Sequence, residues 1–206
     1  MRTICCLLVF FFIFACNPKK AQVDLPELSH PKHIELNEQY ADAEKSPLKK
    51  EDLAKFKSLK FYPANEAFKV KAQIERTPEA KPFEMVTSTD RLPVYRKYMN
   101  LKFTIDGVEQ QLAAYRNQAF IGHPEYGNLL FIPFLDETNG IESYGGGRYI
   151  DIEIPDENAT EILLDFNGCY NPYCAYNDKY SCPKPPLENA LDVEIKAGVQ
   201  YGLILD

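Results

Sequence analysis

Apolar and polar residues alternate along the chain from Phe68 onward. Over residues 68–75, every second position is apolar and the positions between them are polar. Because successive side chains of a β-strand point to opposite faces, this period predicts a strand with one buried face. Two more alternating runs, 101–105 and 108–114, flank Asp106-Gly107. Asp-Gly between such runs is typical of a two-residue β-hairpin.

Further segments have the composition of short strands, and they are 83–88, 129–136, 148–154, 161–166 and 201–205. Many short strands with close turns predict a mainly β (α+β) fold, either an antiparallel β-sandwich or a barrel-like domain. Residues 34–61 are expected to form one or two short N-terminal helices that cap the sheet. Leu53, Phe56 and Leu59 recur there at a spacing of three, which indicates one apolar helical face.

The N-terminus has the features of an export signal. Residues 4–15 form an unbroken apolar run of 12 residues after Arg2. A membrane-spanning helix needs about 20 apolar residues, so the run fits a secretory signal peptide over residues 1–15. It ends in Ile-Phe-Ala-Cys16, which resembles the lipobox of bacterial lipoproteins. We therefore predict lipidation of Cys16, although an ordinary signal peptide that contains a cysteine is the alternative.

This N-terminus also predicts the location and the division of the chain. A lipidated Cys16 places the protein in the bacterial cell envelope, exported and anchored to the membrane, facing the periplasm rather than the cell surface. Residues 16–33 are polar and contain three prolines, a composition that predicts a lipidated flexible tether. We expect no role for His30 and His33, which lie at the end of this segment. Residues 34–206 are expected to form a single β-rich domain. The net charge of −7 argues against nucleic acid as a partner.

One arginine stands alone among many acids. Between Arg116 and Lys179 the only Lys or Arg is Arg148, whereas residues 120–165 contain ten Asp and Glu. The alternation places Arg148 on the apolar face of its strand, and a buried guanidinium requires carboxylate or carbonyl partners. Asp136 and Asp165 are the expected partners. Either a buried ion pair locks the Gly-rich turn 145–147 to the sheet, or Arg148 binds an anionic group of a ligand.

A second segment, 164–189, holds four tyrosines and four prolines and leaves a strand as a long loop. Long ordered loops are uncommon unless they bind or catalyse. We predict that a small anionic or polar ligand binds where this loop meets the Gly-rich turn. The predicted ligand-binding residues are Arg148, Asp136, Tyr144, Asp165, Asn167 and Asn171.

The three cysteines after residue 16 lie in this loop, at positions 169, 174 and 182. Their spacing is not the paired pattern of a zinc site, so no metal and no cofactor are predicted. A disulfide between Cys174 and Cys182 that fixes the loop is expected. A zinc site completed by His123, a nucleophilic cysteine with His123 as its base, and three reduced thiols are the alternatives.

Most familiar catalytic motifs are absent from the sequence. It contains no G-x-S-x-G, no H-E-x-x-H and no Walker loop, and residues 145–147 precede a strand rather than a helix. Whether the protein is an enzyme stays open. One alternative function is a hydrolase that uses a carboxylate pair such as Asp136 and Glu142. Another is a structural partner of a second envelope protein, which an exposed apolar patch would indicate.

Several short sequence motifs occur in the order that is typical of one bacterial family. They are 61–63, 134–140, 144–149, 164–167, 170–175, 182–183, 185–186 and 188–189. Together they resemble the domain-of-unknown-function family 1684, from about residue 47 to near the end of the chain.

The resemblance implies a compact β-rich domain with no established activity, so it supplies no catalytic residue. It also implies that Cys174 and Cys182 belong to the family pattern and that Cys169 is incidental. The family's Asn-Arg-Leu ending is Asn189-Ala190-Leu191 in this chain. A second arginine for an anion site is therefore missing.

Overall fold

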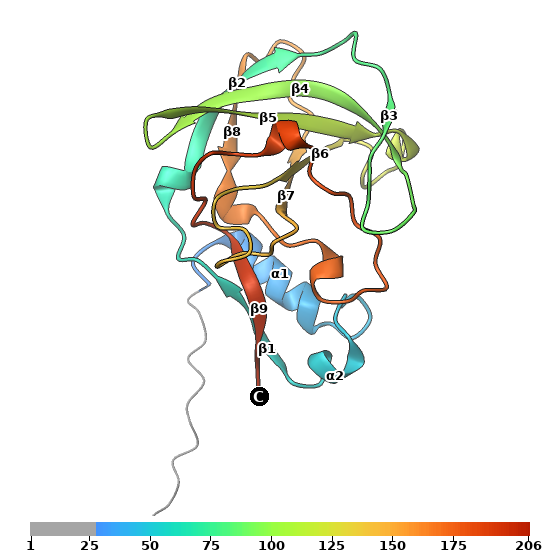
Figure 1. Cartoon of the computed structure of the whole chain (residues 1–206), viewed down its shortest axis with the longest axis vertical. Helices are drawn as coiled ribbons and strands as arrows, with labels where there is room; N and C mark the ends of the chain where they lie inside the picture. Colours follow the sequence, from blue (N-terminus) through green and yellow to red (C-terminus); the bar gives the residue numbers. More distant parts are fainter. Residues whose placement is uncertain (1–27) are drawn as a thin grey trace, which may run out of the picture.

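Figure 1 shows the computed structural model of the chain, which describes residues 28–206. The predicted signal peptide, Cys16 and most of the predicted tether lie outside the described residues. Within the described part, no helix has both the length and the apolar character needed to cross a membrane.

A seven-stranded antiparallel sheet curls around the main core as a half-barrel, which confirms the mainly β fold class (Figure 1). Its strand order is β7-β6-β5-β4-β2-β8, and β3 pairs with β4 beside this path. The strands are β2 (Lys69–Arg76), β3 (Phe83–Glu84), β4 (Val94–Ile105), β5 (Val108–Asn117), β6 (Leu129–Phe134), β7 (Arg148–Glu153) and β8 (Glu161–Asp165). Apolar side chains from the concave face form the main core, in which Leu101, Leu112 and Ile132 have no exposed surface.

The β4–β5 hairpin is the longest feature of the sheet and confirms the predicted two-residue turn. Ile105 pairs with Val108, and Asp106 and Gly107 between them have φ values of +52° and +78°. Two successive positive φ values define the hairpin turn whose twist matches that of the flanking strands. β4 begins at Val94, seven residues before the alternating run that predicted it.

A two-stranded sheet, β1 (Phe56–Phe61) with β9 (Val199–Leu205), extends away from the larger sheet in Figure 1. The prediction of a helix over Phe56 and Leu59 is therefore wrong. These residues pair with β9, so their spacing of three reflects an irregular strand with register shifts rather than a helical face. The helices present are α1 (Pro31–Ala41) and α2 (Lys50–Leu53). α1 packs on β1 and buries Leu36 and Tyr40 in a second apolar cluster.

Helix α1 begins inside the predicted tether, so the boundary of the folded domain at residue 34 is wrong. The His30 side chain caps the helix by accepting the Lys32 N–H at 3.2 Å. His33 is fully buried, stacks on Phe61 with ring centroids 4.2 Å apart, and donates from Nε2 to the Asn167 carbonyl at 2.9 Å. Both histidines, which the sequence left without a role, thus fix the helix to the domain.

Short 3-10 turns connect the remaining segments. They are η1 (Glu66–Phe68), η2 (Gln118–Phe120), η3 (Phe166–Gly168), η4 (Tyr173–Ala175) and η5 (Leu187–Asn189). The last three lie in the long Tyr/Asn/Pro loop, so this loop is an ordered chain of turns.

Burial of His33 predicts an acid-sensitive fold. Desolvation lowers the pKa of His33 from 6.5 to about 4, and its Nδ1 has no hydrogen-bond partner within the described residues. The unfolded chain therefore binds this proton at a higher pH than the folded chain, and the folded state loses stability as the pH falls from about 6.5 to about 4. The loss attributable to His33 is about 3 kcal/mol over this window and absent above it.

Urea unfolding of the wild type and of His33→Gln at pH 7, 6, 5 and 4.5 measures this contribution. The free energy of unfolding should fall more steeply with decreasing pH in the wild type than in the variant. Equal slopes for the two proteins would contradict the assignment.

Candidate functional site

The Gly-rich turn delivers Arg148 into the interior. Gly147 has φ +87°, and a Cβ at this position would lie 2.5 Å from the Phe134 carbonyl oxygen, so only glycine fits. Arg148 follows as the first residue of β7, opposite Phe134 of β6. Its side chain has no exposed surface and its guanidinium lies 5.5 Å from the centre of the Phe134 ring.

The Arg148 guanidinium is held by a carboxylate and by backbone carbonyls. Its Nη2 donates to Asp136 Oδ2 and to the Ile195 carbonyl, both at 2.7 Å, and its Nη1 donates to the Ala197 carbonyl at 2.7 Å. The other oxygen of Asp136 accepts the Thr138 hydroxyl at 2.6 Å. Asp136 is thus confirmed as the partner of Arg148, and the pair joins three segments distant in sequence.

This geometry is that of the buried ion pair, and it does not favour the predicted binding of a ligand by Arg148 and Asp136. Neither side chain has any surface in contact with solvent. An anionic ligand in solvent therefore cannot contact the Arg148 guanidinium, which was the main group expected to bind it.

Asp165 is not a second partner of Arg148. Its Oδ1 accepts the Asn167 backbone N–H at 2.9 Å, and its Oδ2 lies 3.1 Å from His30 Nε2. Asn167 is buried, and its side chain accepts the Asn65 N–H at 2.8 Å and donates to the Asn65 carbonyl at 3.0 Å. These two residues of the predicted ligand site therefore fix η3 to the neighbouring chain.

Asn171 is likewise internal. Its Nδ2 donates to the Tyr176 hydroxyl at 2.8 Å and to the Gln200 carbonyl at 3.0 Å, and the residue is 1% exposed. Tyr144 is half-buried and packs on Tyr201 with ring centroids 5.4 Å apart. Of the six predicted ligand residues, only Tyr144 lies near a chemically reactive group, which is the pair Cys174 and Cys182.

Cys174 and Cys182 are brought together, as the sequence predicted, but both are free thiols in the structure. The Cys174 N–H donates to the Cys182 sulfur at 3.2 Å. The sequence is therefore right that the two cysteines are neighbours, and the disulfide between them stays a prediction, because the structure shows them without an S–S bond. Among residues 28–206, no three His, Cys, Asp or Glu side chains converge so as to hold a metal ion. The arrangement of the described residues therefore does not favour the zinc alternative with His123.

The carboxylate pair of the hydrolase alternative is also not assembled. Asp136 is sealed inside the protein, whereas Glu142 is exposed at the surface, 3.9 Å from Lys196 Nζ. A carboxylate without contact to solvent cannot activate a water molecule for attack on a substrate. The geometry does not favour this mechanism.

A different concave site lies on the outer face of β6 and β7. It is a cavity of about 240 Å³ in which the rings of five aromatic residues surround one carboxylate. The aromatic residues are Tyr95, Phe120, Tyr126, Phe131 and Tyr170, and the carboxylate is Asp151. No other charged side chain lines this cavity.

The sheet and the long loop position these groups together. Asp151 of β7 lies directly opposite Phe131 of β6, so both side chains share one face. Tyr170 is bound to β7 by two backbone hydrogen bonds with Tyr149, at 2.8 and 3.0 Å, and its hydroxyl donates to Asp151 Oδ2. Tyr95 and Phe131 pack with centroids 5.7 Å apart.

The electrostatics of Asp151 are unusual for an exposed residue. The side chains around it displace much of its water, which raises the pKa of Asp151 above its ordinary value. Within residues 28–206, no lysine, arginine or histidine forms an ion pair with it. Lys32, which lines the adjoining hollow with Asp151, partly offsets this rise. A carboxylate that is poorly hydrated and forms no ion pair still attracts a positively charged group.

Two neighbouring hollows share residues with this cavity. One of about 120 Å³ also contains Asp151 and Tyr170, and an open one of about 820 Å³ also contains Tyr126. The open hollow is lined by the acids Glu35, Glu38, Asp42 and Glu125 against a single cation, Lys45. The approach to the aromatic cavity is therefore acidic, which favours the arrival of cations.

Another hollow of about 820 Å³ lies over β2, β4 and β5, on the outer face of the sheet. Its walls are long flexible side chains such as Lys69, Lys71, Lys102 and Glu109. It has the composition of an ordinary solvated sheet surface and lacks the enclosed aromatic walls that ligand sites usually have.

Sequence reasoning missed this aromatic site because it followed the isolated arginine. The alternation did place Tyr149, Asp151 and Glu153 on the outer face of their strand. The aromatic residues that cover this face come from four separate segments, and pairing them with Asp151 requires the strand order. The one local signal was that an outward face carried Phe131 and Tyr149 instead of charged residues.

The fold and the site define a mainly β domain with a half-barrel sheet, an internal ion pair and an aromatic cavity on its outer face. The family described as "Protein of unknown function (DUF1684)" matches residues 54–200, and the chain belongs to this family. The resemblance seen in the sequence is thereby confirmed at the level of the family.

A solved structure supports the same conclusion. The chain is similar to an uncharacterized protein of Haloarcula marismortui whose solution NMR structure is known, with 32% sequence identity and a TM-score of 0.65. The similarity covers 82% of this chain and 89% of the other. No curated protein matches the sequence.

The internal ion pair predicts a large loss of stability on substitution. Arg148→Met leaves the Asp136 carboxylate buried without a cation, so the free energy of unfolding should fall by about 3–5 kcal/mol. Lys102→Met is a matched control, because the ion pair of Lys102 with Glu75 is more than half exposed and should contribute less than about 1 kcal/mol. Denaturant unfolding measures both, and similar losses for the two variants would contradict the role of Arg148.

Proposed function

We propose that the protein is a lipid-anchored domain of the bacterial cell envelope that binds a small organic cation in the aromatic cavity beside Asp151. The observation that carries the ligand class is the Asp151 carboxylate, which lies in a cavity lined by five aromatic residues and forms no ion pair within residues 28–206. The proposed ligand is small and polar, as expected from the sequence, but it carries a positive charge instead of a negative one.

Aromatic rings and a carboxylate recognise a cation by complementary means. The faces of Tyr and Phe rings carry negative electrostatic potential, and each favourable contact with a cation contributes about 0.5–2 kcal/mol. The Asp151 carboxylate adds a direct attraction that is strong where little water is present. A volume of about 240 Å³ suits a primary amine or a quaternary ammonium group with a short substituent.

The long loop contributes directly to this site through Tyr170. Its hydroxyl orients the Asp151 carboxylate, while burial and the adjacent carboxylate raise the pKa of Tyr170 well above its ordinary value. Tyr170 therefore remains a hydrogen-bond donor over the physiological pH range. The loop and the strand after the Gly-rich turn meet here, on the outer side of β7 rather than on the side of Arg148.

Membrane attachment is supported by the sequence of the first sixteen residues. The short apolar run and the Ile-Phe-Ala-Cys16 ending support removal of a signal peptide and lipidation of Cys16. Several acyl chains on one residue anchor a protein stably, where a single chain binds only marginally.

Replacement of Cys16 tests the anchor. Cys16→Ser should abolish incorporation of a labelled fatty acid and move the protein from the membrane fraction to the soluble fraction of bacterial cells. Cys169→Ser is the control and should leave both properties unchanged. Fatty-acid incorporation into Cys16→Ser would contradict the proposal.

Ligand binding is tested with choline and with 3,3-dimethyl-1-butanol, which has the same shape and no charge. Choline should raise the melting temperature and give a saturable calorimetric titration, because its ammonium group faces the Asp151 carboxylate. The neutral alcohol should bind at least about tenfold more weakly, a difference of about 1.4 kcal/mol. Methylamine and tetramethylammonium extend the test to smaller cations.

Two variants locate the site. Asp151→Asn keeps the shape of the side chain and removes its charge, so the affinity for choline should fall at least about tenfold. Glu153→Gln removes an exposed charge two residues along the same strand, outside the cavity, and should bind choline as the wild type does. Absence of binding by all three cations, or equal affinity of Asp151→Asn and the wild type, would overturn the proposal.

A further inference from the structure

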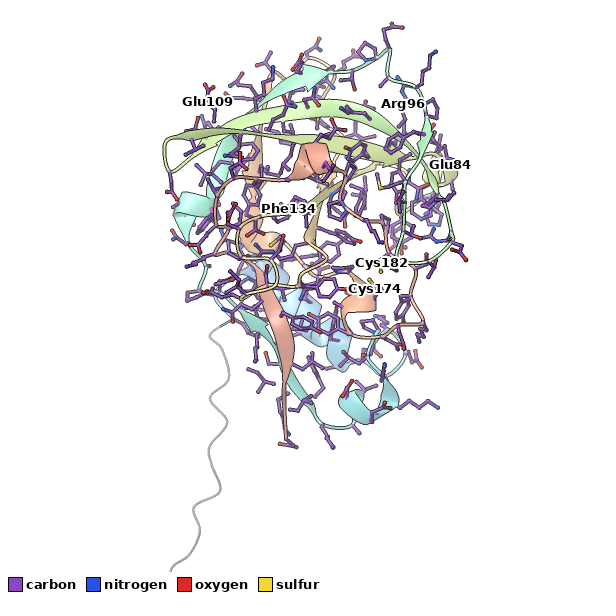
Figure 2. The ribbon with its side chains drawn as sticks, in the orientation of Figure 1. Glu84, Arg96, Glu109, Phe134, Cys174 and Cys182 are labelled. Atoms are coloured by element: carbon purple, nitrogen blue, oxygen red, sulfur yellow. The ribbon has the colours of Figure 1, made fainter. Side chains whose placement is uncertain are left out.

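Two cysteines from different turns meet at the surface of the long loop. Cys174 lies in η4 and Cys182 lies eight residues later, and Figure 2 shows the two side chains next to each other. The Cys174 N–H donates to the Cys182 sulfur at 3.2 Å, and both thiols are free. The aromatic cavity beside Asp151 does not include either residue.

Cys182 is fixed by the strand-like segment 87–88. The Ser88 N–H donates to the Cys182 carbonyl at 2.8 Å, and the Cys182 N–H donates to Ser88 Oγ at 3.1 Å. The next residue, Pro183, forms a bridge with Thr87, and its carbonyl accepts the Tyr149 hydroxyl. The Cys182 sulfur is therefore held in place below the surface, with the residue 8% exposed.

The two sulfurs differ in exposure and in ionisation. Cys174 is partly exposed, and its pKa is lowered because the Cys182 thiol donates to its sulfur, with further hydrogen bonds from Ser88 and Tyr144. The same contact raises the pKa of Cys182, since its proton is shared with the Cys174 sulfur and burial adds to the effect. The difference in exposure and the opposite directions of the two pKa shifts both point to Cys174 as the more readily ionised sulfur of the pair.

The third cysteine shows what a structural thiol looks like in this protein. Cys169 is fully buried, its sulfur lies 3.4 Å from the Ala197 carbonyl, and burial raises its pKa. It lacks both the exposure and the converging donors of Cys174. The three cysteines thus separate into one inert residue and one asymmetric pair.

We propose that Cys174 and Cys182 form a thiol–disulfide exchange site, in which Cys174 attacks and Cys182 resolves. The co-reactant is the disulfide of a small thiol or an exposed disulfide of another protein. This activity goes beyond the proposed binding of cations and does not rest on it.

The exchange proceeds in two balanced steps. The Cys174 thiolate attacks one sulfur of the co-reactant, whose S–S bond breaks, and the released thiolate takes a proton from solvent. The Cys182 thiol then transfers its proton to the second leaving sulfur as it bonds to Cys174 Sγ. The two protein thiols are oxidised to one disulfide, and the co-reactant is reduced to two thiols.

Partial exposure and fixed geometry favour this sequence of events. A lowered pKa of Cys174 favours the attacking thiolate near neutral pH. Cys182 is buried, so it reacts only with Cys174 Sγ, after Cys174 has formed the mixed disulfide with the co-reactant. A purely structural disulfide does not need one partly exposed and one buried sulfur.

Oxidised glutathione tests the order of attack on the full chain, with peptide mass spectrometry reporting each cysteine separately. In the wild type, a Cys174–Cys182 disulfide should form and dithiothreitol should reverse it without denaturation. Cys182→Ser should accumulate glutathione on Cys174. Cys174→Ser should leave Cys182 unmodified over the same time, and Cys169 should stay unmodified in every protein.

Three results would overturn the proposal. The first is that Cys182 in Cys174→Ser is modified as fast as Cys174 in Cys182→Ser. The second is that dithiothreitol reduces the Cys174–Cys182 disulfide only in denaturant. The third is that neither cysteine reacts with oxidised glutathione. Circular dichroism of each variant shows whether it is folded.

The hydroxyl donor provides a second test that leaves both cysteines in place. Tyr144→Phe removes one hydrogen bond to the Cys174 sulfur, so alkylation of Cys174 by iodoacetamide at pH 6 should slow by about threefold, which corresponds to half a pKa unit. Tyr201→Phe is the matched control, because Tyr201 packs on the Tyr144 ring and has no part in the hydrogen bonds to this sulfur. Equal rates for Tyr144→Phe and Tyr201→Phe would contradict the ionised state of Cys174.

Discussion

The ion pair between Arg148 and Asp136 is the contact on which the arrangement of the domain depends. Both side chains are completely buried, and charges in the interior persist only when their partners are fixed around them. Here the partners belong to the turn after β6, the start of β7 and the segment 195–197. The ion pair and its hydrogen-bond acceptors therefore fix the positions of these three segments relative to one another.

That placement also sets the two exposed sites. Arg148 points into the core, and Tyr149, the next residue, points outward and bonds to the backbone of Tyr170 and Pro183. Tyr170 completes the cavity around Asp151, and Pro183 follows the thiol of Cys182. The first two residues of β7 thus connect a rigid interior with a ligand cavity on one side and a reactive sulfur pair on the other.

The parts predictable from the sequence were those determined by local spacing. Alternation identified β2, the β4–β5 hairpin and the inward direction of Arg148, and of its two expected partners, Asp136 and Asp165, the structure bears out Asp136. β1 was mistaken for a helix because its pairing with β9 joins residues about 140 positions apart in sequence. His33 was overlooked because its burial depends on Asn167, equally distant along the chain. The cavity around Asp151 was missed for the same reason, since its walls come from separate strands and loops.

The closing strand has a consequence for biosynthesis. β9 pairs with β1, near the beginning of the domain, and Arg148 bonds to carbonyls at Ile195 and Ala197. The guanidinium therefore lacks its full set of acceptors until residues 195–197 are available. A chain synthesised only as far as β8 therefore leaves Arg148 without these acceptors, and the native interior forms only after residues 195–197 have joined it.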